Sequence, residues 1–337
     1  MRPVQILHAL HLPSQVVGSA LLAALLTVAL VAILASQAYW QEWRSIELET
    51  ADRSRLQGAW LLIGTHDWAR SRLRDDAQRS PAVDHASEAW AQPVVSMPLA
   101  VFLAGSTAAK ERSSAAADRA SEPDSNALAA SFVSQQLSDA QGKMNVLNLL
   151  EGQALSAQWL QAFDKLFEVL KLPPEQLATL SRNLRQASAR PQAGAGSTAL
   201  AGSVLLPHQS TQLVWLGLAP ATLAALQAHV TLLPSRTPVN LNSASVEVLQ
   251  SLLPSFKRAD AERVVALRQS KPLQAVSDAG ISDLQSEGQY SVSSRFFELH
   301  TEISLGSVRV AENALLQRDG IDVRTLWRRR AVAAQTP

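Results

Sequence analysis

The chain has 337 residues, and 47% of them are hydrophobic, which is enough for folded cores outside any membrane segment. Its formal net charge is only +1, so bulk electrostatics give no reason to expect a nucleic-acid partner. It contains no cysteine, which excludes disulfides, cysteine-ligated zinc and thiol catalysis.

An uncharged apolar run occupies residues 16–39, and no Asp, Glu, Lys or Arg occurs between Arg2 and Glu42. A membrane span needs about 20 apolar residues, and in lipid a helix satisfies its own backbone. A cleaved secretory signal is the alternative, but the run is longer than the usual apolar region of about 7–15 residues. Aromatic residues typical of a membrane–water interface follow at its end: Tyr39, Trp40 and Trp43. We therefore expect a retained transmembrane helix over residues 19–40, although its flanking charges do not favour an outside carboxyl-terminal part.

The helix is expected to continue beyond the membrane. Residues 41–74 contain no proline, and an apolar stripe with roughly helical spacing runs among charged neighbours. The stripe consists of Leu56, Trp60, Ile63 and Trp68. We predict one helix over about residues 17–74, whose second half packs against a soluble domain.

Strand-like sequence follows in two places. Residues 90–105 contain two prolines, which break helices, and four residues that suit strands: Val94, Val95, Val101 and Phe102. Residues 130–137 form a second candidate strand, and residues 139–142 resemble a turn. Between the two strands, residues 106–126 lack apolar periodicity and are rich in Ala, Ser and charge, which predicts a disordered loop.

The central part of the chain has a helical pattern. From Leu155 to Leu170, apolar residues recur every three or four positions, and Pro173 ends that helix. The next helix has Pro174 in its first turn, and residues 190–202 form a second low-complexity loop. Further helices are predicted at residues 220–229, 243–253 and 260–269.

The last element is predicted to be a β-hairpin. Residues 290–301 are rich in aromatic and β-branched side chains, residues 305–307 form a turn, and residues 307–319 supply the second strand. The arginines at positions 328–330 are interpreted as a solvated tail.

The simplest architecture is α+β. A long N-terminal transmembrane helix continues into an α/β domain, which carries an inserted all-α domain and a C-terminal β-hairpin. The expected parts are residues 19–40 for the transmembrane helix, 41–150 and 288–330 for the α/β domain, and 151–287 for the inserted helical domain.

The sharpest local signal lies in residues 237–253, TPVNLNSASVEVLQSLL. Asn242 or Ser243 is a good N-cap, and Glu247 can close a capping box. The string resembles the start of helix-hairpin-helix DNA-binding modules, but residues 253–257, LPSFK, lack the two glycines of their hairpin. A purely structural helix pair is the favoured interpretation, and a membrane-anchored helix-hairpin-helix DNA-binding protein is the alternative.

A search for catalytic and metal sites in the sequence finds none. The seven histidines are scattered, without H-E-x-x-H or any other metal-ligand spacing. The adjacent pairs His66–Asp67 and Asp84–His85 are interpreted as solvated surface residues. We therefore nominate no catalytic residue, no metal ligand and no cofactor.

Three segments carry a family resemblance when they are taken together. Gly18 precedes SALLAALLTVALVAILA, which is similar to a G-x-A-L-L anchor, and residues 139–145, DAQGKMN, are similar to a D-x-Q-G-[KR]-x-N element. The third segment is the pair of strings at residues 233–253 and 292–320. The chain resembles the K-subunit family of minor pseudopilins in type II secretion.

The resemblance implies a non-enzymatic assembly subunit at the tip of a pseudopilus, with the I and J subunits as neighbours. Such a subunit helps to initiate assembly and the export of folded periplasmic proteins. Residues 1–18 would be a prepilin leader, which the prepilin peptidase removes between Gly18 and Ser19. The remainder would cross the bacterial inner membrane once, beside the inner-membrane secretion platform, with its carboxyl-terminal part in the periplasm.

The resemblance also bears on two particular sites. Ala23 would be the fifth mature residue, where most pilin-like subunits have glutamate, and a tip subunit has no neighbour above it for that carboxylate to pair with. Family members bind calcium, but the region before the V-N-L-N string has no obvious carboxylate cluster in this chain. The resemblance therefore makes calcium an expectation without assigned ligands.

Overall fold

The computed structural model describes residues 15–105, 131–188, 205–252, 256–280, 288–305 and 308–331, without the side chains of residues 15–18 and 103–105. The predicted loops at residues 106–126 and 190–202 lie outside these residues, as does most of the predicted leader. The chain forms two units, one of residues 1–57 and one of residues 58–337.

Helix α1 spans Gln15–Arg79, which confirms the predicted long helix and extends it by a few residues at each end. Its side chains from Ser19 to Thr50 are all exposed, as expected for a helix whose apolar surface faces lipid. Within the described residues, α1 is the one helix long and apolar enough to cross a membrane. The helix ends shortly before Pro81, because proline disfavours helical backbone at the preceding Ser80.

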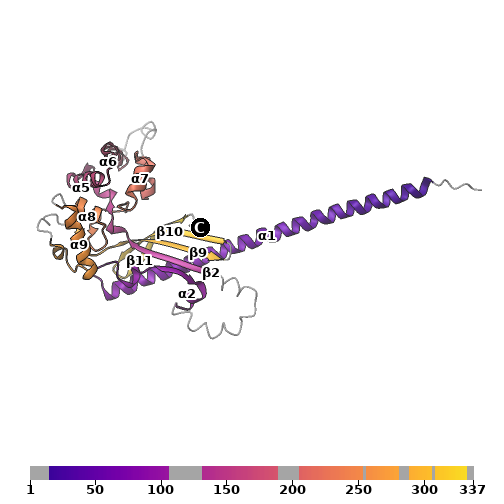
Figure 1. Ribbon diagram of the computed structural model, residues 1–337, viewed down its shortest axis with the longest axis horizontal. Helices are drawn as coiled ribbons and strands as arrows, with labels where there is room; N and C mark the ends of the chain where they lie inside the picture. Colours follow the sequence, from indigo (N-terminus) through magenta and orange to yellow (C-terminus); the bar gives the residue numbers. More distant parts are fainter. Residues whose placement is uncertain are drawn as a thin grey trace, which may run out of the picture. The chain divides into compact units, whose positions relative to one another are not determined.

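The second unit contains a five-stranded antiparallel sheet with the order β1-β2-β9-β10-β11, along which the end of α1 runs (Figure 1). Its strands are β1 (Val94–Pro98), β2 (Ser131–Asp139), β9 (Phe296–Leu305), β10 (Val308–Asp319) and β11 (Asp322–Ala331). The sheet confirms the predicted strand near residues 130–137 and the pairing of the two strands predicted as a hairpin.

A third strand, β11, extends that hairpin and was not predicted from the sequence. It pairs with β10 from Asp319 opposite Asp322, so Gly320 and Ile321 form a two-residue turn, in which Gly320 adopts a left-handed φ of 58°. The Asp-Gly step was the available signal for this turn. The arginines at positions 328–330 are exposed, as predicted, but they belong to β11 rather than to a tail.

Val101 and Phe102, which were predicted to lie in a strand, belong instead to the short helix α2 (Leu99–Gly105). Leu99 and Phe102 are three residues apart, so in a helix both can face the same side. Both are buried in a cluster with Leu62 of α1 and Val133 of β2. Burial of this apolar face outweighs the local β propensity of the segment.

The end of α1 packs on the sheet through two apolar clusters with a polar layer between them. One cluster includes Leu62, Val133 and Ile303, and the other includes Ala69, Leu137 and Leu299. At the intermediate positions of α1 and of three strands stand polar side chains: Thr65, His66, Gln135, Thr301 and Glu312. Gln135 Nε2 donates to the Thr65 carbonyl at 2.9 Å and to Thr301 Oγ1 at 3.2 Å. His66 Nε2 lies 3.0 Å from Glu312 Oε1.

A helical segment between β2 and β9 forms the largest apolar core, and its helices gather beyond one end of the strands in Figure 1. Its helices are α5 (Ala157–Val169), α6 (Pro174–Ser188), α7 (Pro220–Leu226), α8 (Val246–Leu252) and α9 (Arg258–Ser270). The predicted helices are confirmed, with α6 beginning at proline as expected and α8 beginning three residues later than expected. The domain boundaries expected from the sequence stay a prediction.

Short 3₁₀ turns and strands connect these helices to one another and to the sheet. The 3₁₀ turns are η1 (Ala89–Ala91), η3 (Ala140–Gly142), η4 (Val146–Leu149), η6 (Ser210–Leu216) and η7 (Val276–Ala279). Two short parallel pairs join β3 (Met144–Asn145) to β6 (Val230–Thr231) and β7 (Val239–Asn240) to β8 (Tyr290–Ser291). A further antiparallel pair joins β4 (Leu150–Glu151) to β5 (Ala154–Leu155).

Candidate functional site

The D-x-Q-G and V-N-L-N segments, far apart in the sequence, meet where the helical segment joins the sheet. Asp139, the last residue of β2, lies at the centre of this polar junction. Its Oδ2 accepts hydrogen bonds from Asn240 Nδ2 at 2.8 Å, from Ser294 Oγ at 2.7 Å and from the hydroxyl of Ser243. Its Oδ1 accepts from the Gln141 backbone N–H at 2.7 Å. Burial raises the pKa of Asp139, and these four donors oppose that rise.

Two amide side chains, Asn145 at the end of the first segment and Asn148 just after it, hold the loop that enters β7. Asn148 pairs with the backbone of Thr237, donating to its carbonyl at 2.8 Å and accepting from its N–H at 3.1 Å. Asn145 donates to the Ser235 carbonyl at 2.7 Å. Gly142 lies against Ser243, and a Cβ added there would stand 2.9 Å from the Ser243 carbonyl oxygen, so only glycine fits. The two segments therefore form one tightly packed joint.

Asn242 does not cap α8, contrary to the prediction. The cap is Ser245, whose Oγ accepts from the Val248 N–H at 3.3 Å, because α8 begins only at Val246. Asn242 instead bonds the backbone of Leu273, donating to its carbonyl at 3.0 Å and accepting from its N–H at 2.9 Å. Its role is to tie the segment after α9 to the junction.

A buried arginine network lies beside Asp139. Arg318 of β10 donates to both carboxylate oxygens of Asp84 at 2.6 Å and to Asp76 Oδ2 at 2.8 Å. Asp84 has no exposed surface, and its Oδ2 also accepts from the Ser294 N–H at 2.7 Å. Burial and the charges of Glu88 and Asp84 raise the pKa of Asp76 to about 6, against the opposing effect of Arg318. The prediction of a solvated Asp84 is therefore wrong.

His66 of α1, also predicted to lie on the surface, is buried in the polar layer between α1 and the sheet. Burial, followed by the charge of Arg328, lowers its pKa to about 4. Sequence reasoning missed both residues, because what covers them comes from strands more than 200 positions away.

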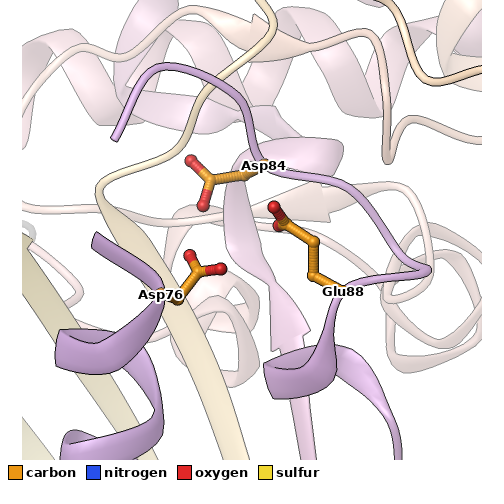
Figure 2. A group of neighbouring side chains, drawn as sticks. All are labelled: Asp76, Asp84 and Glu88. Atoms are coloured by element: carbon orange, nitrogen blue, oxygen red, sulfur yellow. The ribbon is translucent and has the colours of Figure 1, made fainter. Parts of the chain in front are cut away.

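The carboxylates of Asp76, Asp84 and Glu88 point toward one another (Figure 2), with one oxygen of each lying within 4.8 Å of the others. Calcium takes about six to eight oxygen ligands. Here Arg318 already supplies the compensating positive charge, and Glu88 Oε2 accepts from Trp90 Nε1 at 2.7 Å. These residues therefore do not fit a calcium site, and the expectation of calcium gains no ligands from them.

Two family models match the V-N-L-N loop and most of the helical segment. Both describe the type II secretion system protein K, and they cover residues 142–235 and 239–293. A curated relative, the type II secretion system protein K of Pseudomonas aeruginosa, is 25% identical over 325 residues, covering 89% of this chain and 88% of its own length. The chain is therefore similar to the type II secretion protein K family over most of its length.

A solved structure agrees with this similarity at the level of the fold. The chain is similar to a chain in the crystal structure of the GspK-GspI-GspJ complex from the enterotoxigenic Escherichia coli type 2 secretion system. The TM-score is 0.60 at 19% sequence identity, covering 84% of this chain and 99% of that chain. The α+β fold class expected from the sequence is confirmed.

The residues that the family resemblance assigned to processing and to the tip lie in α1. Gly18, Ser19 and Ala23 belong to the first unit, and Ser19 and Ala23 are exposed. Ser19 and Ala23 are four residues apart and so lie on the same helix face. Leader cleavage and the role of Ala23 stay predictions for this chain.

The helix pair that resembled a DNA-binding module has features of a structural element. Phe256 is buried in the core cluster, and its carbonyl accepts from Lys165 Nζ at 3.0 Å. Arg258 pairs with Glu262 at 2.8 Å and Arg263 with Asp260 at 3.5 Å, so two of the three arginines of α9 are already paired rather than open to a phosphate backbone.

Proposed function

We propose that this chain is a non-enzymatic minor pseudopilin at the tip of a type II secretion pseudopilus. It helps to initiate assembly of the pseudopilus and the export of folded periplasmic proteins. The observation that carries the proposal is the combination, in one chain, of an exposed apolar helix with the two protein K modules on the fold described above. The proposed neighbours are the I and J subunits, as in the complex that the structural relative forms.

Co-purification tests the proposed assembly. The full-length chain, expressed with its own I and J pseudopilins, is expected to be recovered with them from detergent-solubilised inner membranes. A chain lacking residues 140–294 serves as a control, because it keeps the membrane anchor but lacks the helical segment. Recovery of the full chain without either pseudopilin contradicts the proposal. Salt-resistant DNA binding by the same preparation would instead favour the alternative of an anchored DNA-binding protein.

Processing is proposed to place the mature amino terminus at Ser19, after the prepilin peptidase cleaves behind Gly18. A small residue at the cleavage position gives a peptidase access to the backbone. Gly18→Val is therefore expected to leave a longer, uncleaved protein, whereas Gly64→Val, a second helical glycine, should be processed normally. Mass spectrometry of assembled protein decides, and retention of Met1 in an assembled pseudopilus contradicts the proposal. A mature chain that begins at Ser19 is proposed to cross the inner membrane once through α1. Its carboxyl-terminal part then lies in the periplasm, near the secretion platform.

The tip position is proposed from the alanine at position 23. A glutamate there would need a neighbour's amino terminus inside the apolar helix bundle, because an unpaired charge in that setting costs several kcal/mol. Ala23 avoids this requirement in a subunit that has nothing above it. Cysteine crosslinking along isolated filaments should find this subunit once, at the end. Repeated contacts between its copies down the shaft contradict the capping role.

A further inference from the structure

A cleft of about 630 Å³ opens beside the polar junction, on the side where the sheet meets the helical segment. Its volume lies within the range of pockets that enclose small ligands or short peptide pieces. The walls come from the loop after α1, the end of β2, the V-N-L-N loop and α9. The side chains that line these walls include His85, Trp90, Asp139, Lys143, Ser243 and Arg268.

Four ionisable side chains line the cleft, and they differ in their hydrogen-bond partners, ion-pair partners and charge. Both oxygens of Asp139 accept hydrogen bonds from the junction. Lys143 Nζ is paired with Glu298 at 2.7 Å. Burial lowers the pKa of His85, which favours its neutral form. Only Arg268 lines the cleft as a cation without a carboxylate partner among the described residues.

Arg268 is half-buried and, among the described residues, makes one hydrogen bond, from Nη1 to the Leu241 carbonyl at 2.5 Å. Its neighbours on the same helix behave differently, since Arg258 pairs with Glu262 and Arg263 pairs with Asp260 at 3.5 Å. Burial lowers the pKa of Arg268 to about 10, and no carboxylate in the described part of the chain is seen to oppose this effect. Burying a guanidinium whose N–H groups lack hydrogen-bond partners costs free energy, unless an anion accepts those hydrogen bonds.

We propose that the cleft binds a carboxylate of an extended protein segment from another chain, with Arg268 as the group that holds it. A guanidinium presents its donors in a planar fork that matches a carboxylate, so the Nε and Nη2 donors can bond both oxygens. One unpaired cation suits a single negative charge, which favours a carboxylate over a doubly charged phosphate. The indole of Trp90 supplies an apolar wall for the rest of the segment.

The choice of a protein segment as occupant rests on the proposed function, because a subunit at the tip of a pseudopilus meets other protein chains. The carboxylate can come from an acidic side chain or from a chain terminus, and both present the same chemistry to Arg268. The competing explanation is that Arg268 is purely structural and serves only to bond the Leu241 carbonyl. It predicts effects on stability alone, without any effect on ligand binding.

Binding of synthetic peptides to the full-length chain in lipid nanodiscs tests the proposal. The probe is a labelled Gly-Ser-Asp-Ser-Gly peptide with an amidated end, and its neutral twin carries Asn in place of Asp. A third peptide carries Asn and a free terminal carboxylate, which separates the two carboxylate sources. Fluorescence anisotropy is expected to show that at least one carboxylate peptide binds about tenfold or more tightly than the neutral twin.

Two arginine variants of the same helix form the matched comparison. Arg268→Gln should weaken binding of the carboxylate peptide about tenfold or more, whereas Arg263→Gln should leave it unchanged. If Arg268→Gln does not fold, Arg268→Lys replaces it, because lysine keeps the charge but lacks the fork. Weaker binding at an unchanged melting temperature then supports the proposal.

Three outcomes overturn the proposal. They are equal binding or no binding of all three peptides, equal weakening by the Arg268 and Arg263 variants, and stronger competition by inorganic phosphate than by the carboxylate peptide. Because the isolated chain is used, failure of peptide binding leaves the tip role standing. Failure of the co-purification test likewise leaves a positive peptide result standing.

Discussion

Replacing Arg318 with methionine is expected to destabilise the second unit strongly. The side chain is 6% exposed and bonds Asp84 at 2.6 Å and Asp76 at 2.8 Å, and it also donates to the Ser294 carbonyl at 3.0 Å. Removing one partner of a buried ion pair costs about 3–5 kcal/mol, because the other charge stays buried without compensation. Asp84, which has no exposed surface, cannot recover its hydration, so we expect a loss in this range near neutral pH.

The pH dependence of the loss distinguishes orphaned charge from lost packing. In the wild-type protein the pKa of Asp76 is already raised to about 6, and Arg318 is one of the groups that oppose a further rise. An acid with a higher pKa in the folded than in the unfolded chain binds more protons when folded. Its contribution to stability therefore falls as the pH rises from about 4 upward. The loss caused by Arg318→Met should be largest near about pH 8 and smaller near about pH 5.

Urea unfolding of the full-length chain in detergent micelles, followed by tryptophan fluorescence across this pH range, measures the effect. Trp90 is a suitable reporter because it packs edge-on against Phe297, with ring centroids 5.0 Å apart, and Arg318 lies over the same Phe297 ring. Arg324→Met is the matched control, since Arg324 is 66% exposed and its ion pair with Asp319 should contribute about 1 kcal/mol or less. A loss below about 1 kcal/mol for Arg318→Met, or one that does not vary with pH, would refute this reasoning.

Three further substitutions probe the junction and the polar layer. Asp139→Asn should cost about 1–3 kcal/mol in urea unfolding, because an amide cannot accept from all the donors around that carboxylate, while Asp67→Asn on the exposed face of α1 should change little. Asn242→Ala should cost about 1–3 kcal/mol by leaving the backbone of Leu273 unpaired, and an unchanged unfolding midpoint would contradict that role. His66→Gln should flatten the pH dependence between about 6.5 and 4, since a lowered histidine pKa makes the wild type less stable as the pH falls through this window. An identical slope in both proteins would show that His66 does not titrate in this window.

Much of the fold could be predicted from local pattern. The apolar run of α1 is long enough to imply a membrane helix, and the apolar residues of α5 recur at helical spacing. The strands β2, β9 and β10 contain alternating or β-branched sequence of ordinary length. The strand β11 was missed because its run of exposed arginines obscures the alternation of buried and exposed side chains that marks an edge strand.

The junction could be located from sequence but not explained by it. Its two motifs were recognised as strings, yet their partners depend on pairings across the fold, such as Asp139 with Ser294 at a separation of 155 positions. Asn242 illustrates the difficulty, because its position before a helix suggests a cap while the helix starts later, at Val246. Charge alone made Asp84 look like a surface residue, because nothing near it in the sequence indicates that Arg318 would cover it.

The chemistry of the junction limits what its side chains can do. Both oxygens of Asp139 accept hydrogen bonds, both ends of the Asn148 amide bond the backbone of Thr237, and Gly142 leaves no space beside Ser243. Side chains satisfied in this way are poor candidates for catalysis, because a general base or a metal ligand needs an oxygen free to accept. The shared motifs therefore act as a joint that fixes the helical segment on the sheet. In the proposed role, recognition of other chains falls to surfaces around the joint, and the cleft beside it is lined by one cation, Arg268, that has no carboxylate partner among the described residues.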